Sequence, residues 1–308
     1  MFHYETRMKL AVTCAVTALF LAHPVMAQNY RSWVSNGGKD QNDCTIDHPC
    51  KTFQRAHDQT FDAGEVDVLD PGDYGTLKVN RSITIDGGNM GYIACPGFCS
   101  AITINAATSR VTVRNLSIFN PAELPTGWES YGIEWTTGSA LSVENVSIDG
   151  VQAGIYVAAQ VALTSQAVTP RLLRVNNTSI RDFTLYGINI VGVQTTDIHT
   201  YPVSAVVDHA VIESEKSVCC NGETIGIYAT AGQIEVARSV ISGVGSGVWV
   251  DGNAEANVED STIVYSLASS GEFVGKPAIS EASCREEAVQ LAAGRVDRAL
   301  LFLGAVVE

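Results

Sequence analysis

The segment GIEWTTGSALSVENVSI at residues 132–148 decides the fold, because both of its ends recur along the chain. Its second half carries Val143 five residues before Ile148, and this pair returns in six copies. The isoleucines are Ile118, Ile148, Ile180, Ile212, Ile241 and Ile263, and the valines are Val113, Val143, Val175, Val207, Val236 and Val258. Two columns filled identically in every copy do not follow from composition, so the chain contains an internal repeat.

Each copy opens with a small residue followed by a branched apolar one. These openings are Ala101-Ile102-Thr103-Ile104, Gly132-Ile133-Glu134-Trp135, Gly154-Ile155-Tyr156-Val157, Gly187-Ile188-Asn189-Ile190, Gly226-Ile227-Tyr228-Ala229 and Gly247-Val248-Trp249-Val250. Alternating apolar residues that are mostly β-branched are typical of half-buried strands. A copy of roughly 22 to 32 residues cannot bury its apolar face alone. We therefore expect the copies to stack into an all-β parallel β-helix with a continuous dry core.

The position three residues before the repeat isoleucine holds a polar turn former or a charged residue. In three successive copies it is Asn115, Asn145 and Asn177. Stacked at about 4.8 Å, these amides could form a hydrogen-bonded ladder. Each also starts an Asn-x-Ser sequon, which we interpret as a by-product of the repeat and not as a glycosylation site.

With these Gly-Ile-x-Val and Val-x-Asn-x-x-Ile rungs, residues 31 to 266 resemble the secreted right-handed parallel β-helix proteins of the pectate-lyase-like superfamily. The resemblance implies a right-handed β-helix with capped ends. It does not imply one activity, because enzymes and non-enzymes share this scaffold.

The ends of the chain differ from the repeat. Residues 1–27 are typical of a secretory signal, with Arg7 and Lys9 before an apolar stretch and small residues up to Ala27. We therefore expect a secreted or periplasmic protein. After cleavage we expect no membrane span. Residues 28–65 predict a strand, loop and short-helix cap, residues 66–266 the β-helix, and residues 267–308 a C-terminal cap or tail. We expect that tail to be helical, since Ser283 and Glu286 have capping-box spacing.

The charge balance restricts the partners. The chain carries a formal net charge of −14, which becomes −15 when residues 1–27 with Glu5, Arg7 and Lys9 are removed. Nucleic acid is a poor partner for so acidic a chain, because binding it requires many Lys and Arg residues.

The cysteines indicate an oxidising compartment. Close spacing predicts the local disulfides Cys44–Cys50 and Cys95–Cys99, and the pairing of the remaining cysteines stays open. Two alternatives are a metal site and a calcium site in the N-terminal loop. Their candidate ligands are Cys44, His48, Cys50 and His57 for the metal, and Asp40, Asp43 and Asp47 for calcium.

One outward-facing column contains the best candidates for binding. The residue between the two apolar ones of each opening should point to solvent. Down the repeat this column is Thr103, Glu134, Tyr156, Asn189, Tyr228 and Trp249. Aromatic rings on a solvent-facing strip could stack on the sugars of an extended glycan, with Glu134 and Asn189 binding hydroxyl groups. The alternative is that these residues only favour strands and that a loop covers them.

Catalytic residues are not evident. Asp208 and Glu259 could be about 10 Å apart, a separation compatible with inverting hydrolysis, although solvated charges explain both. We expect no basic residue in the aromatic column, and we assign no catalytic or metal-binding residue and no cofactor. The sequence thus favours a non-catalytic protein that contacts a polysaccharide or a cell-surface glycan. The alternatives are a divergent polysaccharide lyase, which would require calcium, a glycoside hydrolase, or a structural or adhesive solenoid.

Overall fold

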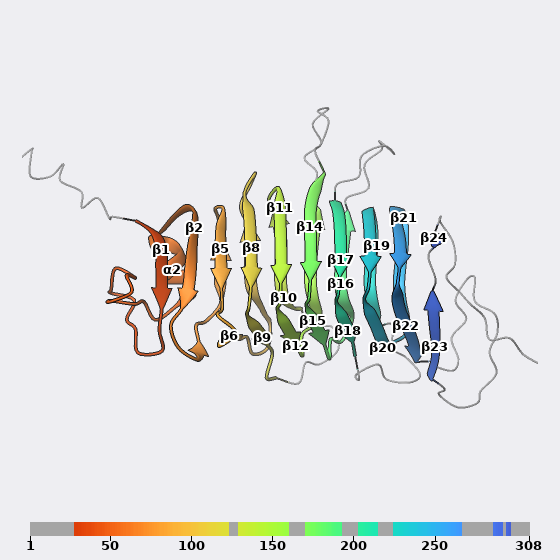
Figure 1. Cartoon of the computed structure of the whole chain (residues 1–308), viewed down its shortest axis with the longest axis horizontal. Coiled ribbons are helices and arrows are strands. Elements are labelled where there is room, and N and C mark those ends of the chain that lie inside the picture. The colour runs from red at the N-terminus through yellow and green to blue at the C-terminus, as the bar shows by residue number, and fades with distance from the viewer. Residues whose placement is uncertain are drawn as a thin grey trace, which may run out of the picture.

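The computed structural model describes residues 28–122, 129–159, 170–192, 203–214, 224–266, 286–291 and 294–296. Within these ranges the chain forms a parallel β-solenoid whose rungs lie side by side along one axis (Figure 1). The predicted signal segment and Cys219, Cys220 and Cys284 lie outside the described residues.

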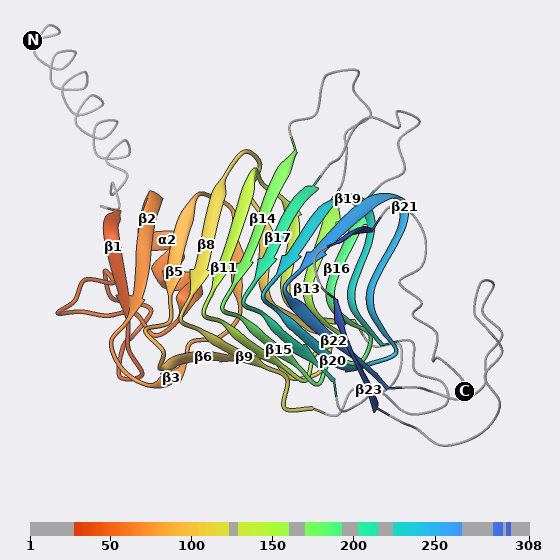
Figure 2. The same ribbon diagram turned by 45° about the vertical axis from the view of Figure 1, so that its right-hand side comes forward.

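Each central rung contributes one strand to each of three faces (Figure 2). The first face holds β4 (Leu77–Val79), β7 (Cys99–Asn105), β10 (Ser130–Thr137), β13 (Ala153–Ala159) and β16 (Tyr186–Gly192), and the first halves of β19 (Ile225–Ala237) and β21 (Ser246–Glu259). The second face holds β1 (Asn29–Val34), β2 (Thr60–Val68), β5 (Ile83–Asp86), β8 (Arg110–Arg114), β11 (Ala140–Glu144), β14 (Arg171–Asn176) and β17 (Val203–Asp208), and the second halves of β19 and β21. The third face holds β3 (Gly72–Asp73), β6 (Gly91–Ala94), β9 (Ser117–Phe119), β12 (Ser147–Asp149), β15 (Ser179–Arg181), β18 (Val211–Glu213), β20 (Val240–Val244) and β22 (Ser261–Ser266).

The two aliphatic columns predicted from the repeat are confirmed. Val143 pairs with Val113 and Val175, and Ile148 pairs with Ile118 and Ile180, in parallel register. Every valine and isoleucine of the two columns is at most 2% exposed. Burying one such side chain stabilises the fold by about 1.5–3 kcal/mol, so the stacked columns are the main source of cohesion between rungs.

The asparagine ladder is also confirmed, and it explains the corner between the second and third faces. Asn145 donates through Nδ2 to Asn115 Oδ1 at 2.9 Å, and Asn177 donates to Asn145 Oδ1 at 3.2 Å. All three have positive φ, between 48° and 54°, a left-handed conformation that asparagine tolerates better than most residues. The ladder amides are therefore engaged in hydrogen bonds within the fold.

A column of glycines forms the corner that leads into the first face. A Cβ on Gly132, Gly154, Gly187, Gly226 or Gly247 would lie 2.4–2.5 Å from Cγ2 of the isoleucine in the same coil. Glycine and the apolar residue after it thus both face the interior. The extra inward position shifts the in-and-out alternation, so the residue before each glycine can point outward.

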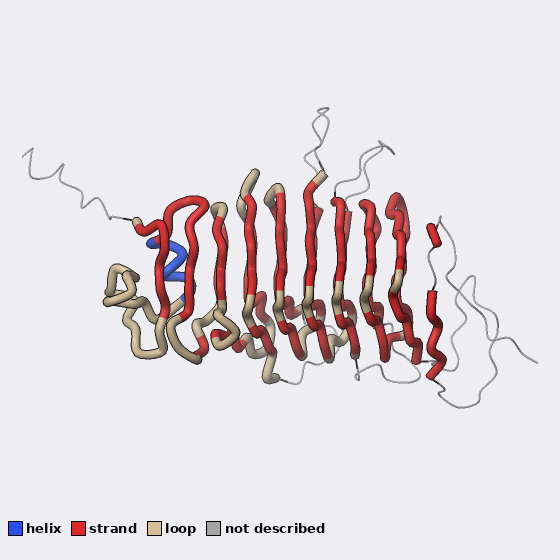
Figure 3. The backbone as a smooth tube through the Cα atoms, viewed as in Figure 1, coloured by secondary structure: helices blue, strands red, loops and turns tan. Residues whose placement is uncertain are grey.

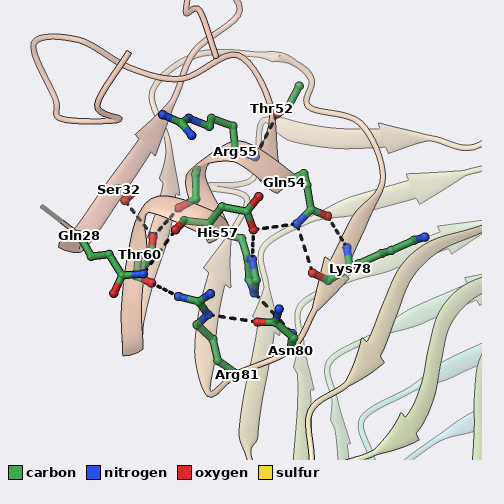
Figure 4. Close-up of polar contacts among 12 residues, drawn as sticks. Gln28, Ser32, Thr52, Gln54, Arg55, His57, Thr60, Lys78, Asn80 and Arg81 are labelled. Atoms are coloured by element: carbon green, nitrogen blue, oxygen red, sulfur yellow. Dashed lines mark hydrogen bonds and ion pairs between the residues drawn. The ribbon is translucent and has the colours of Figure 1, made fainter. Parts of the chain in front are cut away.

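The N-terminal cap contains the helix α2 (Phe53–Gln59), at one end of the solenoid (Figure 3). Its buried Phe53 and Ala56 confirm the predicted apolar side. The buried His57 accepts from the backbone N–H of Asn80 and contacts Asp58 Oδ1 at 2.9 Å, while Gln54 bonds the backbone of Lys78 (Figure 4). These contacts join the helix to the first rungs.

The loop before α2 is closed by a disulfide and not by a metal. Cys44 pairs with Cys50, as predicted, which makes a Cys44, His48, Cys50 and His57 metal site wrong. Burial lowers the pKa of His57, which favours a neutral imidazole engaged in the cap. Asp40 accepts from the backbone N–H groups of Lys51 and Thr52 at 2.9 and 3.0 Å. Among the described residues the loop aspartates do not converge into a cation site.

The predicted C-terminal helix is wrong where the structure describes the tail. β23 (Glu286–Leu291) pairs antiparallel with β22, and β24 (Gly294–Val296) pairs antiparallel with β21. The physical reason is the open edge of the last rung, whose unpaired backbone groups are satisfied by added strands. Short apolar runs fit either a helix or a strand, so the spacing alone did not decide the outcome.

Candidate functional site

The predicted outward column lies on the first face in continuous register. Glu134 pairs with Thr103 and Tyr156, and Asn189 pairs with Tyr156 and Tyr228. Trp249 follows Tyr228 on the next rung and is 39% exposed. The structure therefore brings all the candidate residues into one row, with neighbouring rungs about 4.8 Å apart.

Two further tyrosines, which the sequence analysis missed, extend this row sideways. Tyr131 stacks on Tyr156 with ring centroids 4.7 Å apart, and Tyr186 stacks on Tyr228 at 5.4 Å. Each belongs to a Tyr-Gly-Ile triplet and points outward because the corner glycine after it turns inward. The triplets at residues 131–133 and 186–188 were the available signal.

Together these rings form what we call the aromatic face. Its members come from five successive rungs and are Tyr131, Tyr156, Tyr186, Tyr228 and Trp249. The ring of Trp249 meets that of Tyr228 edge-on at 6.1 Å, so the rings present both flat faces and edges. Pairs of this kind contribute about 0.5–1.5 kcal/mol each beyond burial, which holds the rings in fixed positions.

Glu134 lies at one end of the aromatic face and is positioned by hydroxyl groups. Ser100 donates to Glu134 Oε2 at 2.7 Å, and Thr103 lies within 3.5 Å of the same oxygen. Ser100 directly follows the predicted Cys95–Cys99 disulfide, which the structure confirms. The disulfide loop thus fixes the strand that orients this carboxylate.

Asn189 is the residue whose environment differs most from expectation. Its column position was expected to be open to solvent, but the side chain is only 6% exposed. Among the described residues Asn189 Oδ1 has no hydrogen-bond partner. A buried amide oxygen without a partner costs about 1–3 kcal/mol, so a ligand donor that reached this atom on binding would recover that cost.

The electrostatic environment of the aromatic face is acidic. Burial raises the pKa of Tyr131 to about 12, and Glu129 and Glu134 add to the rise. Burial also raises the pKa of Tyr156, again with help from these carboxylates, and Asp251 acts likewise on Tyr228. All these phenols stay neutral near pH 7 and can donate hydrogen bonds.

One cation does lie in the column, which corrects the expectation that none would. Lys78 pairs in register with Thr103, which places it two rungs from Glu134, or about 10 Å along the axis. It is exposed and lies at the end of the row away from the aromatic face.

Three neighbouring carboxylates on the second face are occupied by arginines. Glu65, Asp67 and Asp86 bring ligand atoms within 4.8 Å of one another. Arg114 bonds Glu65 at 2.6 Å and Asp86 at 2.8 Å, and Arg31 bonds Asp67. This trio is thus an ion-pair network that links rungs. Arg114 thus bonds carboxylates of earlier rungs.

The carboxylates considered for inverting hydrolysis are similarly engaged. Asp208 bonds Arg238 at 2.7 Å, and this contact lowers the pKa of the Asp208 carboxyl. Glu259 accepts from Asn257 Nδ2 at 2.8 Å. A general acid requires a raised pKa, so Asp208 is better suited to an ion pair than to proton donation.

The fold and its surface define a class, a parallel β-helix with an aromatic first face. Comparison with known proteins adds no family: no family model, curated protein or solved structure matches the chain. None of the described helices is long and apolar enough to cross a membrane.

Proposed function

We propose that this chain is an exported parallel β-helix protein, related in function to the non-catalytic members of the pectate-lyase-like superfamily, that binds a glycan along its aromatic face. The observation that carries the proposal is the in-register row of two stacked tyrosine pairs and the exposed Trp249. Export is supported by the signal-like residues 1–27 and by the two disulfides.

The geometry of the row suits an extended polymer better than a compact ligand. From Tyr156 to Trp249 the row covers three rung spacings, on the order of 14 Å. The rings are preorganised by stacking and by the strands beneath them, so little conformational entropy is lost when a chain of sugars is bound. Asn189 lies midway along the row, and its buried Oδ1 has no hydrogen-bond partner among the described residues.

Binding is tested by affinity electrophoresis of the purified protein through gels that contain neutral, acidic or amino-sugar polysaccharides. We expect retention on at least one polymer and a loss of that retention in Trp249→Ala, with an unchanged melting curve. Tyr30→Ala is the matched control, because Tyr30 is 73% exposed but lies on β1 at the far end of the solenoid. Equal retention of wild type and Trp249→Ala on every polymer would refute the proposed use of this face.

The same samples separate the alternative classes. A divergent lyase or hydrolase would release unsaturated uronates or new reducing ends, and the lyase would stop when calcium is chelated. A purely structural or adhesive solenoid would show no polymer preference at all.

A further inference from the structure

Two positions beside the aromatic face present hydrogen-bond acceptors. Glu134 offers carboxylate oxygens, and Asn189 Oδ1 is buried and has no hydrogen-bond partner in the part of the chain that the structure describes. Both accept hydrogen bonds and cannot donate through these atoms. A ligand that lies along the row must therefore bring donors to these two positions.

Negative charge surrounds the rings from both ends. Glu134 is the register neighbour of Tyr156, and Glu129 precedes Tyr131 by two residues. Asp251 is exposed, two residues after Trp249 on the same strand, so both side chains face outward. Burial is the main cause of the raised pKa values of Tyr131, Tyr156 and Tyr228, and the carboxylates Glu129, Glu134 and Asp251 add to these rises.

Within the described ranges, Arg171 and Lys78 do not offset this charge. Arg171 lies over the buried ring of Trp135 at 3.8 Å and donates to the backbone carbonyls of Gly138, Ala158 and Trp135. Its guanidinium is thereby engaged with the core. Lys78 is about two rungs beyond Glu134, on the side away from the rings.

Resting on the glycan-binding function proposed above, we propose that the ligand is a polymer of 2-amino sugars whose ammonium groups lie against the rings and carboxylates of the aromatic face. An ammonium group supplies three donors, which fits Glu134 and the free oxygen of Asn189. It also gains a cation–π attraction to exposed Tyr and Trp rings. A uronate would instead place carboxylates beside Glu134 and Asp251, which is repulsive.

The test uses three oligosaccharides of equal length: oligomers of glucosamine, of N-acetylglucosamine and of galacturonic acid. Titration calorimetry at about pH 5.5, above the ordinary pKa of carboxyl groups, keeps ligand amines and protein carboxylates charged. We expect the glucosamine oligomer to bind about tenfold more tightly than the acetylated one. The galacturonic acid oligomer should bind most weakly.

Two matched variants locate the effect. Glu134→Gln should remove most of the preference for the amine, whereas Glu235→Gln, an exposed carboxylate on the second face, should leave it unchanged. An equal loss in both variants would mean that general acidity attracts the ligand, which would overturn the inference.

The remaining outcomes distinguish this inference from the function on which it rests. If the acetylated or uronate oligomer binds as tightly as the amine and Trp249→Ala abolishes that binding, glycan binding stands and the amino-sugar preference is wrong. If no oligomer or polysaccharide binds, both proposals fail.

Discussion

Replacing Gly187 with alanine should destabilise the solenoid, because the corner has no room for a methyl group. A Cβ at this position would lie 2.4 Å from Ile212 Cγ2 and 2.5 Å from the backbone oxygen of Gly226. Ordinary carbon contacts are about 3.5–4.0 Å, so both neighbours would have to move by roughly 1 Å. Ile212 is fully buried within the isoleucine column, and Gly226 belongs to the next rung.

The expected magnitude follows from two opposing effects. Overpacking a well-filled core costs about 1–3 kcal/mol. Alanine also lowers the conformational entropy of the unfolded chain, which stabilises the folded state by about 0.4–1 kcal/mol. Because one of the obstacles is backbone, we expect a net loss of about 1–2 kcal/mol in the free energy of unfolding, with a fall of about 2–8 °C in Tm for a domain of this size.

Thermal and urea unfolding followed by far-UV circular dichroism measure this loss. Gly37→Ala is the control, since its Cβ would meet only Ser35 Oγ at 3.8 Å, and it should stay within about 0.5 kcal/mol of wild type. A Gly187→Ala protein as stable as Gly37→Ala would contradict the described corner. It would also remove the reason why Tyr186 points outward.

Two further substitutions test the columns beside the core. Asn145→Ala should lower the free energy of unfolding by roughly 1.5–3 kcal/mol, because it removes the ladder hydrogen bonds and places alanine at a left-handed φ of 54°. Asn145→Gly removes the same hydrogen bonds but tolerates this φ, so it should lose about half as much. Equal losses in urea unfolding would show that the left-handed conformation does not contribute. Asp208→Asn should lower Tm at pH 7, because the hydrogen bond from Arg238 holds the pKa of Asp208 below its ordinary value. That contribution is complete above the unfolded-state pKa of about 3.9 and is lost as pH falls through the folded-state pKa, so the Tm difference should narrow only below about pH 4.

The core was predictable because stacking imposes one residue type on each position of every rung. The valine and isoleucine columns recur at a constant spacing in each copy, and the alternation of apolar and polar residues along each strand indicates which side chains face inward. The asparagine ladder followed for the same reason. The left-handed conformation at this position could not be predicted from the sequence. His209, Arg238 and Asp260 adopt it too, with φ of 47–50°, although these residue types do not together indicate a left-handed backbone.

The positions of the aromatic face could be predicted only where strict alternation holds. Glu134 and Trp249 were placed correctly, but Tyr131 and Tyr186 were missed because the corner glycine interrupts the alternation before them. The burial of Asn189 depends on its neighbours in space, which a single strand does not reveal.

Asp86 and Asp208 on the second face have arginine partners, whereas Glu134 on the first face has none among the described residues, and this difference bears on function. On the second face Asp86 and Asp208 are each bonded by an arginine from a neighbouring rung. Glu134 on the first face is held by Ser100 and Thr103, whose hydroxyls donate hydrogen bonds but bring no charge. The solenoid geometry offers the first face the same places for arginine, since every rung repeats the same positions. A negative charge without an ionic partner beside a row of rings is what a site for a cationic ligand requires.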